Sequence, residues 1–173
     1  MALNPQVIGK EMPHGFAGCY ARQPDMIVNT RPAGGTDTIA FGAPLKYDSN
    51  KNVVLMGASS AATDFVGVAG FEIKSALTYL DPVGGQYAPG EPVGVFMRGS
   101  INVKCNNGTP VLGGPVYVRV TANGELPNAP VGGFEAVADS TSSNTVLLTN
   151  CEWGGPADAN GVAELIILTR SNA

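Results

Sequence analysis

The sequence predicts an all-β protein: a small β-barrel or sandwich of short antiparallel strands, preceded by an extended N-terminal arm rich in proline and glycine. Short runs of alternating apolar and polar residues recur along the chain. Val116, Val118 and Val120, for example, share one side of an extended segment. The 23 glycines and 13 prolines interrupt these runs at the spacing expected of strand-connecting turns. Patterns that favour helices are weak, so strands and turns account best for the sequence.

The arm covers residues 1–42 and differs from the rest of the chain in composition and in residue pattern. Pro5, Pro13, Pro24 and Pro32 divide it, and no apolar periodicity is sustained. Such a segment cannot build a core alone, yet it carries too many apolar side chains for a solvated linker. It is expected to dock either on its own β-domain or on a neighbouring subunit, and composition leaves both open. The candidate partner-binding residues in the arm are Val7, Ile8, Met12, Phe16, Tyr20, Met26 and Ile27.

The β-domain covers residues 43–173, enough chain for one domain with one core. Its predicted strands are residues 44–47, 65–80, 92–105, 115–121, 133–138, 145–151 and 162–169. Between the third and fourth of these runs lies Asn107-Gly108, a dipeptide that suits a tight turn in which both residues have positive φ. The spacing predicts a β-hairpin that joins residues 101–105 to residues 116–120.

Residues that could carry catalysis or bind a metal or cofactor do not form a recognised pattern. His14 is the single histidine, and no nucleophile motif accompanies it. Asp158, Asn160 and Gly161 resemble the start of a calcium loop, but the remaining ligands are out of register, so a tight turn explains them better. We therefore expect no enzymatic activity, no metal and no cofactor.

The charge and cysteine content of the sequence limit the classes of partner and the cellular compartment that can be expected. Ten basic and fourteen acidic residues give a net charge of −4, and no basic cluster occurs in the sequence, so nucleic acid is not expected as a partner. The longest strongly apolar run, residues 165–168, is too short to span a membrane. Three widely spaced cysteines form neither a disulfide framework nor a zinc motif, which favours a protein made in a reducing cytoplasm.

Trp153 is the single tryptophan and has two possible roles. It can close one end of a β core or anchor a subunit interface, because its side chain buries a large area in either setting. The core is favoured, and Trp153 is kept as a candidate partner-binding residue.

The order and spacing of several turn motifs resemble those of the structural cement, or head decoration, proteins of tailed bacteriophages. The resemblance is strongest over residues 65–170. It rests on APGEPV at residues 88–93, RGSI at 98–101, GTPVLGG at 108–114, VGGFEA at 131–136 and DANGVAE at 158–164. The resemblance implies a β-rich protein with no catalytic residues that binds the outer face of an assembled capsid.

The leading hypothesis is a capsid cement protein that is made in the host cytoplasm, binds the outer surface of the head and bridges major capsid subunits. Closed symmetry favours a homotrimer at local three-fold axes over a dimer. The alternative is a carbohydrate-binding β-module of a head fibre or tail tip. That alternative predicts an exposed groove lined by Trp153, Tyr79, Tyr87 and Tyr117.

Overall fold

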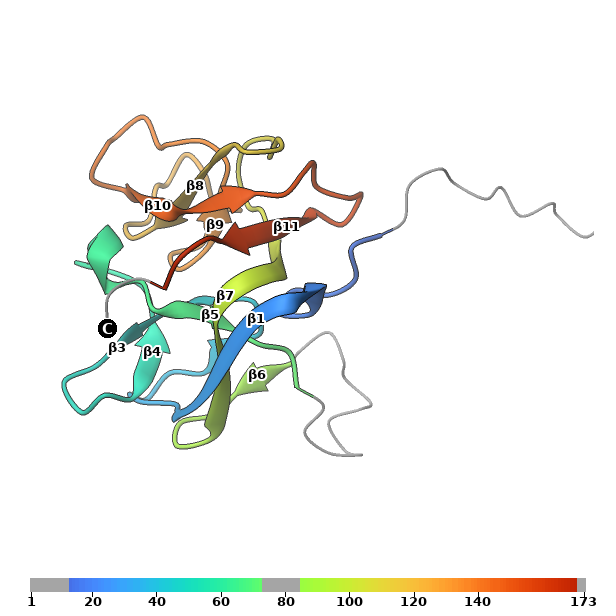
Figure 1. Ribbon diagram of the computed structural model, residues 1–173. Helices are drawn as coiled ribbons and strands as arrows, with labels where there is room; N and C mark the ends of the chain where they lie inside the picture. Colours follow the sequence, from blue (N-terminus) through green and yellow to red (C-terminus); the bar gives the residue numbers. More distant parts are fainter. Residues whose placement is uncertain (1–12, 73–84, 171–173) are drawn as a thin grey trace, which may run out of the picture.

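The computed structural model describes residues 13–72 and 85–170 (Figure 1). Within these residues the protein is built of strands, with one turn of 3-10 helix at Ala62–Asp64 and no α-helix. Every pairing between its strands is antiparallel. The predicted all-β class is confirmed.

One curled sheet contains most of the described strands. Its hydrogen-bonded order is β4 (Val53–Leu55), β3 (Pro44–Tyr47), β5 (Gly67–Ala69), β7 (Pro92–Lys104), β11 (Val162–Ile167), β10 (Thr145–Trp153), β8 (Pro115–Arg119) and β9 (Phe134–Glu135). A further strand, β1 (Tyr20–Pro32), pairs with β7, and a separate small sheet joins β2 (Ile39–Ala40) to β6 (Gln86–Tyr87). In Figure 1, β1 and β7 run between an upper group of strands and a lower one.

Five predicted strands, residues 44–47, 92–105, 115–121, 145–151 and 162–169, agree closely with β3, β7, β8, β10 and β11. The run 133–138 contains only β9, and the run 65–80 contains β5 in its described part, while residues 73–80 lie outside the described residues.

The predicted hairpin is wrong. β11 and β10 separate β7 from β8 in the sheet, so these two strands are not neighbours. The Asn-Gly dipeptide does turn the chain, with Gly108 at a φ of 82°. However, Asn107 donates a side-chain hydrogen bond to Glu135, and its backbone oxygen accepts one from Ala136, so the loop packs against the segment around β9. Alternation shows that a strand has a buried face and does not identify its partner.

β7 contributes side chains to both halves of the core. Val93, Val95 and Met97 pack into one cluster with β3, β4 and β6. Ile101 and Val103 pack into a second cluster with β8, β10 and β11. Because side chains alternate in an extended strand, odd-numbered residues cannot reach both clusters unless the alternation is interrupted between them.

Gly99 lies where the alternation changes. Its φ is 101°, a conformation that other residues rarely adopt. Opposite it, β1 forms a wide bulge: Arg22 pairs with Ser100 and Ile27 with Arg98, so four residues of β1 face the single residue Gly99. A Cβ atom at this position would overlap the backbone carbonyl of Asp25. The bulge and the change of face therefore both require glycine.

A buried ion network holds the loops at the β8–β9 end of the sheet. The Arg119 guanidinium contacts the carboxylates of Glu135 and Asp139, and the three side chains are inaccessible to solvent. Asp139 also accepts hydrogen bonds from the Asn123 side chain at 3.0 Å and the Thr141 backbone N–H at 2.9 Å. With every charge partnered, the network fixes the loops that contain residues 121–133 and 136–144.

Substitution of Gly99 with alanine is expected to destabilise the protein. Backbone strain alone costs about 1–3 kcal/mol, and the overlap with Asp25 adds to it. Gly155→Ala is the matched control, since a Cβ at Gly155 would meet no atom within 4 Å. Chemical denaturation should give a lower free energy of unfolding for Gly99→Ala only; equal values for the two variants would contradict this account of the bulge.

Stability is also expected to decrease in acid because of Asp139. Hydrogen bonds from Asn123, Thr141 and Arg119 hold the pKa of its carboxyl well below the usual range. A lowered pKa in the folded state stabilises the protein above the unfolded pKa of about 3.9, and this contribution is lost as the pH falls toward the folded value. The difference in melting temperature between wild type and Asp139→Asn should therefore shrink as the pH falls from 6 to 3. A constant difference would show that Asp139 makes no pH-dependent contribution.

Candidate partner-binding surface

The described part of the predicted arm lies on the chain's own β-domain. From Val28 to Pro32, β1 pairs residue by residue with β7. Before β1, the Gly18 N–H donates to the Asn102 carbonyl at 2.7 Å, and the Gly18 carbonyl accepts from the Phe71 N–H at 2.8 Å. Residues 20–32 are thus a strand of the main sheet. The domain boundary at residue 42 stays a prediction from composition.

Hydrogen bonds to the turn at Asp158 hold the start of the described arm in place. The Asp158 carboxylate accepts hydrogen bonds from the backbone N–H groups of Asn160, Val162 and His14, at 2.9, 3.0 and 2.9 Å. Burial acts to raise the pKa of Asp158, but these donors outweigh it and hold the pKa below its ordinary value. The Asn102 side chain donates a further hydrogen bond to the His14 carbonyl. His14 and Asp158 therefore anchor the arm, and the tight-turn interpretation of residues 158–161 fits the structure.

The structure places the predicted partner-binding residues in three different environments. Phe16 and Tyr20 present apolar surface, with 55% and 46% of their areas exposed. Met26 and Ile27 are half-buried in the bulged part of β1. The other arm candidates, Val7, Ile8 and Met12, lie outside the described residues.

Trp153 is fully buried, which corrects its selection as a partner-binding residue. Its side chain belongs to the core cluster beneath β8, β10 and β11. The core interpretation, favoured from sequence, is the one the structure supports. Its position near the end of β10, where alternate residues point inward, is the physical reason.

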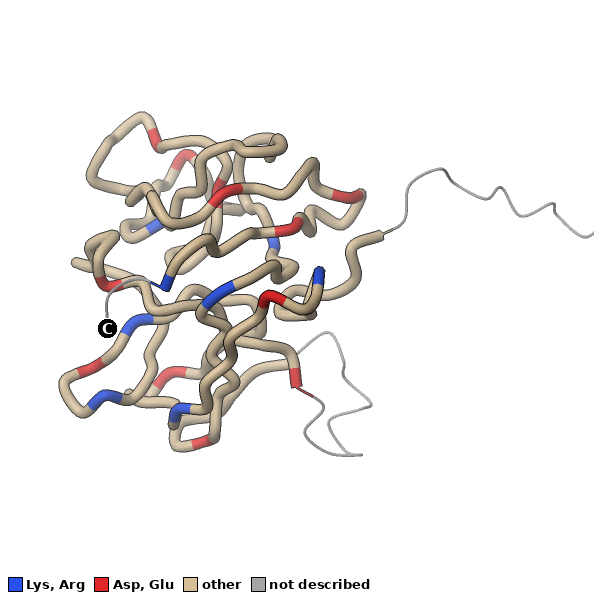
Figure 2. Tube along the Cα trace, in the orientation of Figure 1, with Lys and Arg blue, Asp and Glu red and all other residues tan. Residues whose placement is uncertain are grey.

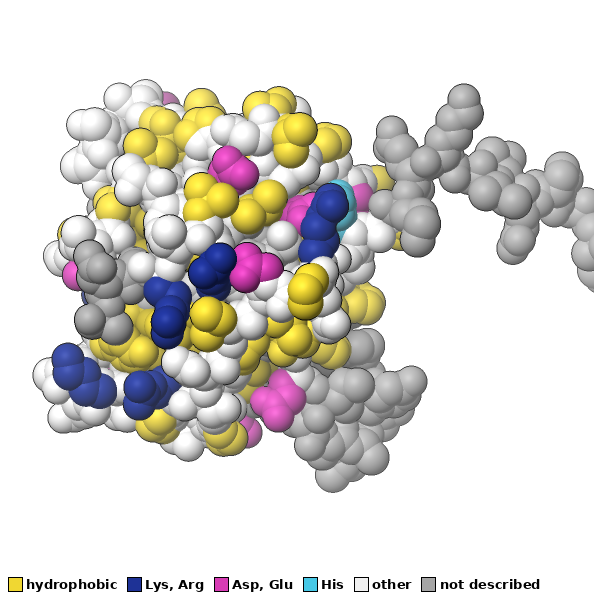
Figure 3. Space-filling model, viewed as in Figure 1, with side chains coloured by type: hydrophobic (Ala, Val, Ile, Leu, Met, Phe, Trp, Pro, Cys, Tyr) yellow, Lys and Arg dark blue, Asp and Glu magenta, His cyan; other side chains and the backbone are white. Residues whose placement is uncertain are grey.

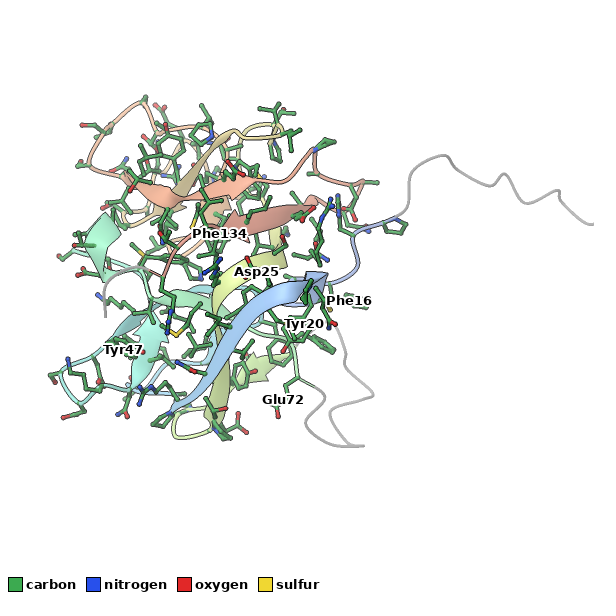
Figure 4. All side chains as sticks on the ribbon, viewed as in Figure 1. Phe16, Tyr20, Asp25, Tyr47, Glu72 and Phe134 are labelled. Carbon is green, nitrogen blue, oxygen red and sulfur yellow. The ribbon has the colours of Figure 1, made fainter. Side chains whose placement is uncertain are left out.

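The exposed rings of Phe16 and Tyr20, labelled in Figure 4, each pack on further aromatic rings, of which Phe96 and Tyr87 are buried. The Phe16 ring stacks on Phe71 with centroids 6.4 Å apart, and the Tyr20 ring lies 5.5 Å from Phe96. Phe41 joins the group edge-on, 5.2 Å from Phe71 and 5.1 Å from Tyr87. Phe71, Tyr87 and Phe96 come from segments distant in sequence from the arm, and Phe41 lies at its far end, so nothing in the sequence signals that these rings meet Phe16 and Tyr20.

Charged side chains surround this face in pairs. The guanidinium of Arg22 binds Glu164 through two hydrogen bonds of 2.7 and 3.0 Å. Arg98 lies 3.3 Å from Asp25. Figure 2 shows basic and acidic positions interspersed along the chain, and Figure 3 shows acidic side chains directly beside basic ones on the viewed face. The pairing leaves this face with little net field from these four groups.

Sequence reasoning missed several exposed apolar side chains outside the arm. They are Val111, Leu112, Val137, Leu147 and Leu168. Leu112 is the most exposed of them, at 77%. One signal was available, since an apolar Val-Leu pair inside a Gly/Pro-rich turn has no obvious place in a core.

The groove predicted by the carbohydrate-binding alternative is not formed by the residues chosen for it. Tyr87 and Trp153 are buried, Tyr117 is half-buried, and Tyr79 lies outside the described residues. In residues 13–72 and 85–170, no group of three or more His, Cys, Asp or Glu side chains is placed to hold a metal ion. No helix in the same ranges is long and apolar enough to cross a membrane.

Comparisons with known proteins are consistent with this architecture. A search of curated proteins finds no match. Among solved structures, a chain from the capsid of Myoviridae phage XM1 has the same fold, with a TM-score of 0.70 and 17% sequence identity. The alignment covers 99% of this chain and 100% of that one. The family model described as "Structural cement protein (E217 gp24/Pam3 gp6)" matches residues 4–168, nearly the whole sequence. The chain therefore belongs to the phage structural cement protein family.

Proposed function

We propose that this cement protein binds the outer surface of the assembled phage head and bridges neighbouring major capsid subunits. The family is a structural class and not an enzyme class. The observation that carries the proposal is the exposed aromatic surface of Phe16 and Tyr20, which pack on the rings of Phe71 and Phe96. Exposed aromatic side chains that cluster on a fixed backbone are typical anchors of protein interfaces.

Binding energy is the proposed mechanism of reinforcement. A protein that binds the assembled lattice and not the free subunits stabilises the lattice by mass action. A bridging protein adds contacts that must all break before two capsid subunits separate. A homotrimer, favoured over a dimer, would multiply these contacts through avidity. Neither nucleic acid nor membrane is part of the proposal.

Purified protein added to heads that lack it is expected to raise their rupture temperature. The increase should saturate with protein concentration, because stabilisation by a ligand of the assembled state follows its occupancy. The measurement is a thermal ramp of heads followed by a dye that reports released DNA, with bound protein quantified in parallel. Heads that bind the protein but rupture at an unchanged temperature would refute the cement mechanism and favour a display or adhesion role.

Deletion of residues 1–12 is expected to weaken attachment to heads and to leave the β-domain folded. The deletion removes Val7, Ile8 and Met12. It leaves the main sheet intact, because the first strand of that sheet begins at Tyr20. Sedimentation of heads with the truncated protein measures attachment, and circular dichroism of the free protein checks its folding. A folded truncated protein that binds heads as tightly as the full chain would remove these three residues from the proposed interface.

A further inference from the structure

We propose that a pocket beside β1 receives a lysine or arginine side chain from the capsid protein. This inference rests on the proposed function and adds to it the chemistry of one contact. The pocket has a volume of about 270 Å³, and its lining comes from β1, β6, β7 and the segment that follows β5. The lining residues are Tyr20, Thr30, Gly70, Phe71, Glu72, Tyr87, Pro92 and Gly94.

The walls of the pocket combine aromatic rings with one carboxylate. Tyr20 and Phe71 contribute rings that reach solvent, Tyr87 is a buried part of the lining, and Glu72 contributes an exposed carboxylate. The electron-rich face of an aromatic ring attracts a cation within about 6 Å. A carboxylate beside such rings adds a charge-assisted hydrogen bond. A long aliphatic stem with a cationic end matches both parts of this lining.

The neutral phenol of Tyr87 favours a cation over an anion as the ligand of the pocket. Its hydroxyl donates a hydrogen bond to the Gly70 carbonyl at 2.7 Å, which fixes the ring. Burial, together with the nearby Glu72 carboxylate, raises the pKa of Tyr87 to about 12, so the phenol stays neutral at physiological pH. The carboxylate of Glu72 is therefore the formal charge that the lining residues contribute.

No lysine or arginine is among the described residues that line the pocket. Elsewhere in the described chain, Arg22 binds Glu164, Arg98 binds Asp25, and Arg119 is buried with Glu135 and Asp139. Arg31 lies over the Tyr47 ring. These arginines are thus engaged at other sites, and the pocket offers a complementary position to a cation from a partner.

The test measures binding to undecorated heads by titration and sedimentation for wild type, Glu72→Gln, Glu72→Lys and Tyr20→Leu. Glu125→Gln is the matched control, because Glu125 is an exposed carboxylate in the loop between β8 and β9, away from the pocket lining. We expect Glu72→Gln and Tyr20→Leu to weaken binding by about tenfold, which corresponds to roughly 1.4 kcal/mol. Glu72→Lys should bind more weakly still, and the control should bind like wild type.

The outcomes separate this inference from the proposed function. Wild type that does not bind heads would overturn the proposed function and this inference with it. Wild type that binds, with Glu72→Gln and Glu72→Lys binding equally well, would overturn the inference alone. Melting temperatures of the free variants show whether any loss reflects unfolding.

A second measurement does not depend on the variants. Nuclear magnetic resonance titration of the wild-type protein with N-acetyl-arginine amide or N-acetyl-lysine amide should shift signals of the pocket residues, and neutral N-acetyl-glutamine amide should not. Equal shifts with all three ligands, or none, would count against a cation site. The chain's own Lys74, two residues after Glu72, is the competing occupant. A Lys74→Ala variant that melts at a lower temperature but binds heads normally would assign the pocket to Lys74 and overturn the proposal.

Discussion

The change of face within β7 is the constraint on which the rest of the structure depends. β7 supplies side chains to both core clusters, and the cluster that its odd-numbered residues join changes at Gly99, where φ is positive and the backbone of Asp25 leaves no room for a Cβ atom. The same point accommodates the bulge of β1. The sheet can therefore curl around two cores that share β7, and β1 is held across the junction. The aromatic surface at Phe16 and Tyr20 is positioned by this arrangement.

The strands of the β-domain were predictable from sequence because a strand with a buried face shows this in the pattern of its own consecutive residues. Pro44–Tyr47 and the run that begins at Pro92 show the alternation or apolar density of buried strands, and the structure has strands there. Pairing was not predictable, because nothing in the alternation of β7 distinguishes β8 from β11 as its neighbour. β1 escaped prediction for a related reason: its bulge breaks the period of two, and its partner lies about 70 residues further along the chain.

The surface residues, too, were predictable where the signal lies in the local sequence and not where it depends on long-range contacts. Phe16 and Tyr20 were selected because apolar residues in a segment without a core need something to contact, and both are exposed. Phe71 and Glu72 could not be selected, because only tertiary structure brings them to Phe16 and Tyr20. Trp153 was selected by residue type, and residue type alone cannot distinguish a tryptophan buried in the core from one exposed at an interface. The Arg119 network was likewise hidden, because its three charged residues look in sequence like ordinary surface positions.

The irregularity of β1 also bears on how the protein avoids aggregation through an exposed strand edge. β1 is thirteen residues long, and among the described strands it pairs only with β7. Flat edges of this length recruit strands from other molecules and lead to aggregates. Here the bulge bends the edge, Pro24 and Pro32 remove hydrogen-bond donors, and Arg22 and Asp25 place charges along it. The strand that displays Tyr20 thus also carries features that protect the protein against fibre formation.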